Sequence, residues 1–165
     1  ASSGIFLGKD FHFDIARPGV AIFGVNPTPG HRNPMKPIVS LKAKILQVRN
    51  AKISETVGYG ATHRISRPSK IATIGVGYAD GFLRSLSNST VGYIGRLKDP
   101  VVGRISMDLI SLDVTDIPEN LSRPGQWVEL IGGQQSVDQL ASAAGTIGHE
   151  ILTSLGNRYQ RVYKR

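Results

Sequence analysis

The chain has 165 residues, 40% hydrophobic and 19% charged, which excludes an intrinsically disordered protein and fits one domain or one domain with part of another. A net charge of +8 raises the possibility of nucleic-acid binding, whereas the lack of a long apolar run excludes a membrane-spanning helix. Zero cysteines exclude disulfides and thiolate chemistry and fit a reducing compartment.

Residues 1–37 read as a short structured piece followed by a linker. A Ser-Ser-Gly turn and an apolar stretch come first, and an Arg-Pro-Gly sequence at 17–19 then leads into the apolar run 20–24. We predict this run to be a buried strand fed by a loop. Residues 25–37 hold four prolines and one glycine, which is typical of a linker and gives the best domain boundary. The opening Ala-Ser-Ser-Gly is unlike a natural amino terminus, so we expect a piece of a longer protein.

From residue 38 onward the hydrophobic pattern has a period of two. Residues 38–45 and 110–114 alternate apolar with polar or smaller side chains, which predicts strands with one buried face. Further short apolar runs occupy residues 70–77, 91–94, 101–105 and 126–131. Many short strands with turn residues between them favour a compact antiparallel β-barrel or sandwich, so the predicted fold class is mainly β.

Two short helices are predicted near the end of this domain. Ser136 and Gln139 form a capping box, and four apolar residues after it fall on one helical face, with Gly145 as the end: Val137, Leu140, Ala141 and Ala144. Thr146 is the expected cap of a second helix through Leu155, closed by Gly156.

The tail 158–163 predicts a strand or an extended segment. Residues 158–165 are the only dense basic stretch of the chain, and aromatic residues interleave their charges as on a single-strand-binding surface. The other basic residues are scattered in ones and twos, which is typical of solvated charge. We therefore expect no nucleic-acid partner and no membrane partner.

Two segments carry candidate chemistry. The Gly-Tyr-Gly sequence at 58–60 sets the Tyr59 phenol between two residues without side chains, so another backbone or a flat ligand can approach it closely. Residues 102–108 place Gly, Arg, Ser and Asp among strand-forming apolar residues, where polar groups must find partners or serve a ligand. The four histidines show no metal-ligand spacing, so we expect no metal site.

Four stretches carry a family resemblance: VGYGATHR, VGYADGFLR, VVGRISMD and, in the tail, LGNRY. In this order they resemble the carboxy-terminal half of a bacterial alanine racemase, a pyridoxal-phosphate (PLP) enzyme. The resemblance implies that residues 1–37 are the end of a PLP-binding (β/α)8 barrel plus the Pro-rich linker. Residues 38–165 are then the carboxy-terminal β domain, with a tail that returns toward the barrel.

The implied activity is the interconversion of L-alanine and D-alanine by two-base proton transfer at Cα, in the cytoplasm, supplying D-alanine for peptidoglycan. The implied cofactor is PLP, and the implied partner is a second copy in a head-to-tail homodimer, in which Tyr59 and Met107 act on the neighbouring barrel. No lysine here lies in the family's Schiff-base motif. We expect that lysine before Ala1, and we expect this chain to be inactive alone.

Individual residues match the family's cofactor and proton-transfer groups. Tyr59 matches the catalytic tyrosine, one of the two bases that racemisation needs on opposite faces of Cα. Arg17 matches the arginine that faces the PLP pyridine nitrogen; a guanidinium only donates, so the nitrogen stays unprotonated and the ring is a weaker electron sink. That weakness favours racemisation over transamination. The residues matching the phosphate site are Ser2, Gly19, Val20 and Tyr159.

Other residues match the substrate site. Met107 matches a residue that binds the substrate carboxylate through its backbone N–H, and Tyr78 matches a tyrosine that lines a narrow substrate entrance. Asp108 follows Met107 and needs a partner if it is buried. Arg104 and Arg84 are reasonable ion-pair partners for it, and all three are read as supporting groups.

Alternatives stay open at this point. Tyr59 fits a strand tyrosine beside a glycine bulge, Arg17 a surface arginine, and Tyr159 or Met107 a residue covering the core. As a whole, the chain also fits a racemase of broader amino-acid range, a non-catalytic PLP carrier, or a basic β-barrel that binds nucleic acid.

Overall fold

Six antiparallel strands form the body of the protein, in the sheet order β6-β5-β8-β1-β4-β7. The structure is a computed structural model that describes residues 1–164. The strands are β1 Leu41–Ala51, β4 Ser69–Ile74, β5 Val91–Ile94, β6 Leu97–Pro100, β7 Ile110–Asp113 and β8 Trp127–Ile131. A bridge between Val101 and Leu112 joins the end of β6 to β7, so the sheet nearly closes on itself. The prediction of a mainly β fold is confirmed.

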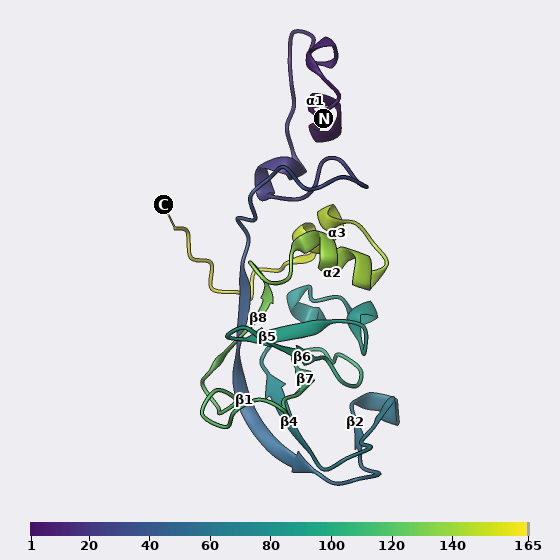
Figure 1. Cartoon of the computed structure of the whole chain (residues 1–165), viewed down its shortest axis with the longest axis vertical. Coiled ribbons are helices and arrows are strands. Elements are labelled where there is room, and N and C mark those ends of the chain that lie inside the picture. The colour runs from purple at the N-terminus through teal and green to yellow at the C-terminus, as the bar shows by residue number, and fades with distance from the viewer. Residues whose placement is uncertain (165) are drawn as a thin grey trace.

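The long strand β1 organises this sheet (Figure 1). Its first residues pair with β8, starting at Leu41 opposite Ile131, and its later residues pair with β4, ending at Ala51 opposite Ser69. The alternating pattern of Leu41, Ala43 and Ile45 buries one face of its first half, as the period of two predicts. One strand therefore contributes to both halves of the barrel.

The interior holds two hydrophobic clusters. The larger one fills the barrel, where Ile74, Leu112 and Leu130 are completely buried, and it continues under the two helices. The smaller one contains Val57 and Val102 and lies under a separate two-stranded ribbon, β2 Thr56–Val57 with β3 His63–Arg64. This small cluster supports the Gly-Tyr-Gly segment, because β2 leads directly into it.

The helices α2 Val137–Ala144 and α3 Gly148–Ser154 cover one end of the barrel, between it and the N-terminal segment (Figure 1). The capping box is confirmed: the Gln139 N–H donates to the Ser136 hydroxyl at 3.1 Å, and the Ser136 N–H donates to the Gln139 side chain at 2.8 Å. The second helix was predicted with Thr146 as its cap, which is wrong. Ile147 occupies the cap position, because the Thr146 hydroxyl bonds to the Glu150 carboxylate instead.

Two strand predictions are wrong. The apolar run 20–24 contains a 3₁₀ turn, Val20–Phe23, in which Ala21 is buried but Ile22 and Phe23 are 55% and 51% exposed. No described strand pairs with this segment, and its apolar, strand-favouring side chains do not form a strand without such a neighbour. Residues 101–105 contribute the bridge at Val101 and one bond from the Val102 N–H to the Ser111 carbonyl, because side chains take up the N–H groups of Gly103 and Ile105, as shown below. The tail forms no strand: it turns at Arg158, bends at Tyr159 and has no regular structure from 160 to 164.

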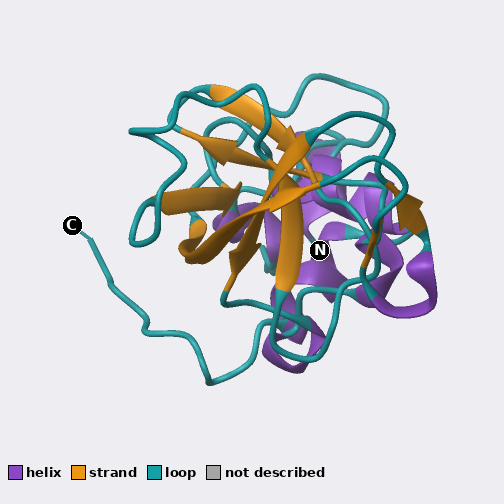
Figure 2. Ribbon diagram, turned by 90° about the horizontal axis from the view of Figure 1, so that it is seen from below, coloured by secondary structure: helices purple, strands orange, loops and turns teal. Residues whose placement is uncertain are grey.

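The segment predicted as a linker is anchored to α2 rather than loose. The Asn26 N–H donates to the Asp138 carboxylate at 3.0 Å, and Val25 is buried in the main core. The N-terminal piece stands beyond the helices, and Figure 2 shows the strands gathered to one side and most helical turns to the other. The boundary between residues 37 and 38 stays a prediction. Within residues 1–164, no helix is long and apolar enough to cross a membrane.

One buried carboxyl makes the fold sensitive to pH. Asp99 in β6 is 1% exposed and lies opposite Gly92 in β5, on the face that points at the core side chains of Leu112 and Val128. The Oδ2 of Asp99 has no hydrogen-bond partner among the described residues. Burial raises the pKa of Asp99 to about 7; Asp113 also raises it, while the Ile94 backbone lowers it.

We expect the free energy of unfolding to fall as the pH rises from about 4 to about 7. The folded chain holds the Asp99 proton more tightly than the unfolded chain, whose carboxyl has the ordinary pKa of 3.8. Replacing Asp99 by Asn should remove this dependence and raise stability at pH 8 by roughly 1–3 kcal/mol. Urea unfolding at pH 5 and pH 8 measures both, with the exposed Asp14→Asn as control. A wild-type chain equally stable at both pH values would contradict this prediction.

Candidate active site

The Tyr59 phenol stands on an exposed turn. The ribbon β2–β3 closes with Val57 opposite His63, and the 3₁₀ turn Tyr59–Ala61 lies between the two strands. The Tyr59 side chain is 73% exposed. The alternative of a strand tyrosine beside a glycine bulge is therefore wrong, since Tyr59 lies in the turn between two strands and its side chain can face a ligand or another subunit.

Two glycine backbones bring a second segment against this turn. A Cβ placed on Gly58 would lie 2.6 Å from the Arg104 nitrogen, and one on Gly103 would lie 2.6 Å from the Val57 carbonyl oxygen. Both glycines have a positive φ, 78° in each case. Any side chain at either position would be strained and would push the two segments apart. The glycines thus keep residues 103–107 beside Tyr59.

An open pocket of about 380 Å³ lies where these segments meet. Its wall carries Tyr59 and Arg104, and the remaining lining residues come from the Tyr59 turn, β4, β7 and the segment before β7: Gly58, Thr73, Ser106, Leu109 and Ser111. The Arg104 guanidinium also lies over Gly60, since a Cβ there would be 2.7 Å from its Nη1. The pocket therefore presents a phenol and a cation side by side.

Tyr78 and Met107 are brought together by backbone contacts. The 3₁₀ turn Tyr78–Asp80 docks on residues 106–107: the Tyr78 N–H donates to the Ser106 carbonyl and the Ala79 N–H to the Met107 carbonyl, both at 3.0 Å. Met107 is 54% exposed, and its own N–H has no acceptor in the described part of the chain. That free donor is the group expected for a carboxylate.

Asp108 has a different partner from the two predicted. It accepts from the Arg158 guanidinium at 2.7 Å, and Arg158 also pairs with Asp80 at 3.1 Å. Within residues 1–164, neither Arg84 nor Arg104 forms an ion pair with Asp108. The reason is the docking of the tail, which carries Arg158 across the Tyr78 turn. Arg158 belongs to the LGNRY motif, which could have indicated a role for it, but the sequence analysis counted it only among the basic residues of the tail.

The loop before β5 holds residues 103–105 in place, which sequence reasoning missed. The Asn88 side chain accepts from the Gly103 N–H at 2.6 Å, and the Ser87 hydroxyl accepts from the Ile105 N–H at 3.0 Å. These contacts take the N–H groups that a strand would use. The only available signal was that Asn tolerates a left-handed backbone, which Asn88 adopts with φ of 58°.

The residues matched to a phosphate site form two groups. The buried Ser2 hydroxyl accepts from the backbone N–H groups of Gly19 at 2.9 Å and Ala21 at 3.3 Å, so a hydroxyl and several amides converge here. Val20 lies between them and has no described acceptor for its N–H. Arg17 is exposed and forms no described ion pair. The Ser2 O–H and the Val20 N–H are left as donors that fit an anion such as a phosphate ester, whereas the Gly19 N–H would have to leave the Ser2 oxygen to reach one.

Tyr159 belongs to the second group. Its hydroxyl is buried without a hydrogen-bond partner among the described residues, and burial, followed by the charge of Asp80, raises the pKa of Tyr159. An orphaned hydroxyl of this kind costs free energy unless a ligand completes it. Tyr159 and Val20 both pack against the main core, but no hydrogen bond joins Tyr159 to Ser2 or Gly19. No group of three or more acidic or histidine side chains suited to a metal ion occurs within residues 1–164.

Comparison with known proteins assigns the family. The sequence model of the alanine racemase C-terminal domain matches residues 38–163. The chain belongs to the alanine racemase family. Alanine racemase of Rhodospirillum rubrum is 56% identical over 162 residues, and that of Acidiphilium cryptum is 57% identical over 164. These matches cover 98% and 99% of this chain but only 43% and 45% of the relatives, so the chain spans less than half of their length.

Solved alanine racemases share the fold. The Bartonella henselae enzyme, described with covalently bound pyridoxal phosphate, superposes with a TM-score of 0.93 at 48% identity, covering 99% of this chain and 45% of that one. The Streptomyces coelicolor enzyme gives 0.85 at 34% identity, covering 92% and 41%. The resemblance drawn from the four motifs is confirmed at the level of family and fold. The roles of single residues stay predictions.

Proposed function

We propose that the protein carrying this chain is a cytoplasmic alanine racemase that interconverts L-alanine and D-alanine and supplies D-alanine for peptidoglycan. The observation that carries the proposal is the exposed Tyr59 phenol, held by paired glycine backbones next to the segment of Met107. A buried phenol would have had no access to a substrate. The family membership and the presence of PLP in a solved relative support the same function.

PLP is the proposed cofactor, and its ring supplies the electron sink that acidifies the substrate Cα–H bond. The Ser2 hydroxyl and the N–H groups of Gly19 and Val20 would hold its phosphate, and the orphaned Tyr159 hydroxyl is a fourth candidate donor. Arg17 would donate to the pyridine nitrogen. Because a guanidinium gives up no proton, that nitrogen stays unprotonated, which favours reprotonation at Cα over transamination.

On the substrate side, Tyr59 holds and moves the proton on one face of Cα. The free N–H of Met107 binds the carboxylate, and half-exposed Tyr78, docked on the same backbone, narrows the entrance. A narrow polar entrance admits alanine and disfavours bulky side chains. The base on the opposite face is the family's lysine, which none of the lysines in this chain matches.

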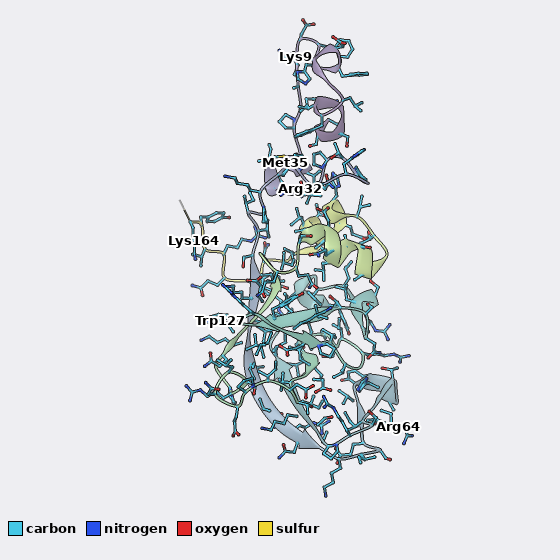
Figure 3. The ribbon with its side chains drawn as sticks, in the orientation of Figure 1. Lys9, Arg32, Met35, Arg64, Trp127 and Lys164 are labelled. Atoms are coloured by element: carbon cyan, nitrogen blue, oxygen red, sulfur yellow. The ribbon has the colours of Figure 1, made fainter. Side chains whose placement is uncertain are left out.

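The distance along the molecule between the phosphate residues of the N-terminal segment and Tyr59 supports a head-to-tail homodimer. Ser2 and Gly19 belong to the N-terminal segment, at the top of Figure 1, whereas the ribbon that carries Tyr59 lies near the bottom. Figure 3 shows the same separation between Lys9 at one end and Arg64, the last residue of β3, at the other. Tyr59 of one chain therefore does not reach the phosphate residues of its own chain. In a head-to-tail pair, Tyr59 and Met107 would act on the neighbouring barrel.

The test is a racemisation assay on the full-length protein reconstituted with PLP. We expect L-alanine and D-alanine to be interconverted at least about tenfold faster than serine, and we expect the 165-residue chain to be inactive alone. Comparable turnover of serine would favour the broader racemase. Bound PLP without turnover of any amino acid would support a non-catalytic carrier and contradict the proposal. Tight, steeply salt-dependent binding of an oligonucleotide would instead favour the nucleic-acid reading.

A further inference from the structure

We propose that Arg158 is a positioning residue that sets the direction of the Met107 N–H by joining Asp80 to Asp108. The inference rests on the proposed racemase function and adds a residue to its substrate site. It concerns binding of the substrate carboxylate rather than proton transfer.

Arg158 connects two carboxylates that come from different segments. Its Nη2 donates to Asp108 at 2.7 Å, and its Nε lies 3.1 Å from Asp80 Oδ1. Asp80 is buried, and its other oxygen accepts the Gly77 N–H at 2.8 Å, so both of its oxygens are engaged. A planar guanidinium is suited to such a bridge, because its donors keep a fixed geometry.

The two carboxylates bracket the peptide that carries the free N–H. On one side, the Tyr78 turn holds the carbonyls of Ser106 and Met107, and this turn ends at Asp80. On the other side, Asp108 follows Met107 directly. Arg158 links the two flanks, because it bonds to both Asp80 and Asp108. With both flanks held, the Met107 N–H keeps one orientation before a carboxylate arrives.

The tail that delivers Arg158 is itself docked on the same turn. The Gly156 N–H donates to the Asp80 carbonyl at 3.0 Å, and Gly81 packs closely against the Ser154 carbonyl. The residue after Arg158 is Tyr159, whose hydroxyl lacks a partner. Arg158 therefore lies between a candidate substrate donor and a candidate cofactor donor.

A purely structural role is the competing explanation. Arg158 and Asp108 are half-exposed, and ion pairs at such places contribute little to folding because water competes for both charges. Asp80 is buried and loses this partner in R158A but keeps the Gly77 N–H, so we expect R158A to fold with reduced stability while the Met107 segment loses a restraint. Asp108→Asn leaves the pair of Arg158 with Asp80 in place, so its effect on alanine binding is independent of that cost. This difference makes the two explanations separable by kinetics.

The test uses Arg158→Ala and Arg158→Lys in the full-length PLP-loaded enzyme. We expect R158A to raise the KM for alanine about tenfold with kcat changed less than about threefold, and R158K to fall in between, since an ammonium replaces the bridge poorly. The inhibition constant of propionate, a carboxylate without an amino group, should rise in parallel. Asp108→Asn should give the same pattern as R158A.

Arg161→Ala is the matched control. Arg161 lies in the same tail and only donates to the carbonyls of Leu155 and Gly156, at 3.5 and 3.4 Å, so its kinetics should equal those of wild type. Unchanged KM and propionate inhibition in both R158A and D108N would overturn the inference, as would equal effects of R161A. A loss confined to PLP content or to kcat would overturn it too. A wild-type enzyme without racemase activity would instead refute the proposed function.

Discussion

Tyr59→Phe should lower racemisation by the full-length enzyme about 10²–10⁴-fold, with PLP content and stability unchanged. The substitution removes only the hydroxyl, which is the proposed proton-transfer group, and losing one such group costs this much. The side chain is 73% exposed, so the fold does not depend on it. Initial rates in both directions, together with the absorbance of the bound cofactor, measure the effect.

The same variant allows a sharper test with deuterated water. If Tyr59 serves one face of Cα and a lysine serves the other, Y59F should still exchange the Cα proton of one enantiomer without inverting it. Tyr163→Phe is the control, because Tyr163 is an exposed tyrosine of the tail and should behave as wild type. Y59F with more than a tenth of the wild-type rate, or with exchange of both enantiomers, contradicts the two-base role.

Gly77→Ala should destabilise the protein by about 1–3 kcal/mol and weaken alanine binding. A Cβ at this position would lie less than 3.0 Å from the carbonyl oxygens of both Ser106 and Met107. These atoms are backbone and cannot move aside as a side-chain tip can. They also accept the N–H groups of Tyr78 and Ala79, so relieving the clash breaks the docking of the turn and displaces Met107.

Urea unfolding measures the loss of stability in Gly77→Ala, and the KM for alanine measures the weaker binding, both in the full-length enzyme. Gly133→Ala is the matched control, because a Cβ at Gly133 meets nothing within 4 Å. The backbone of Gly77 is extended, so the expected cost is steric rather than conformational. A G77A enzyme as stable and as active as G133A would show that the Tyr78 turn does not depend on this close approach.

The sequence could nominate candidate site residues where they belong to a contiguous motif. Tyr59 between two glycines, Met107 and Tyr78 were all placed from short stretches, and the structure brings Met107 and Tyr78 together. The partner of Asp108 was not predictable in this way. Arg158 lies 50 positions after Asp108 in the chain, and nothing in the local sequence ranks it above Arg84 or Arg104 as a partner.

The sequence by itself determined the local features: the alternating strands such as β1 and β7, the capping box that starts α2, and the family. Their causes act within a few residues, through side-chain alternation and reciprocal capping bonds. Only the tertiary structure decided that Val20–Phe23 forms a turn, that Asn88 holds Gly103, and that the Oδ2 of Asp99 is buried without a partner. Each of these outcomes depends on which distant segment lies opposite, and packing of the whole chain sets that pairing.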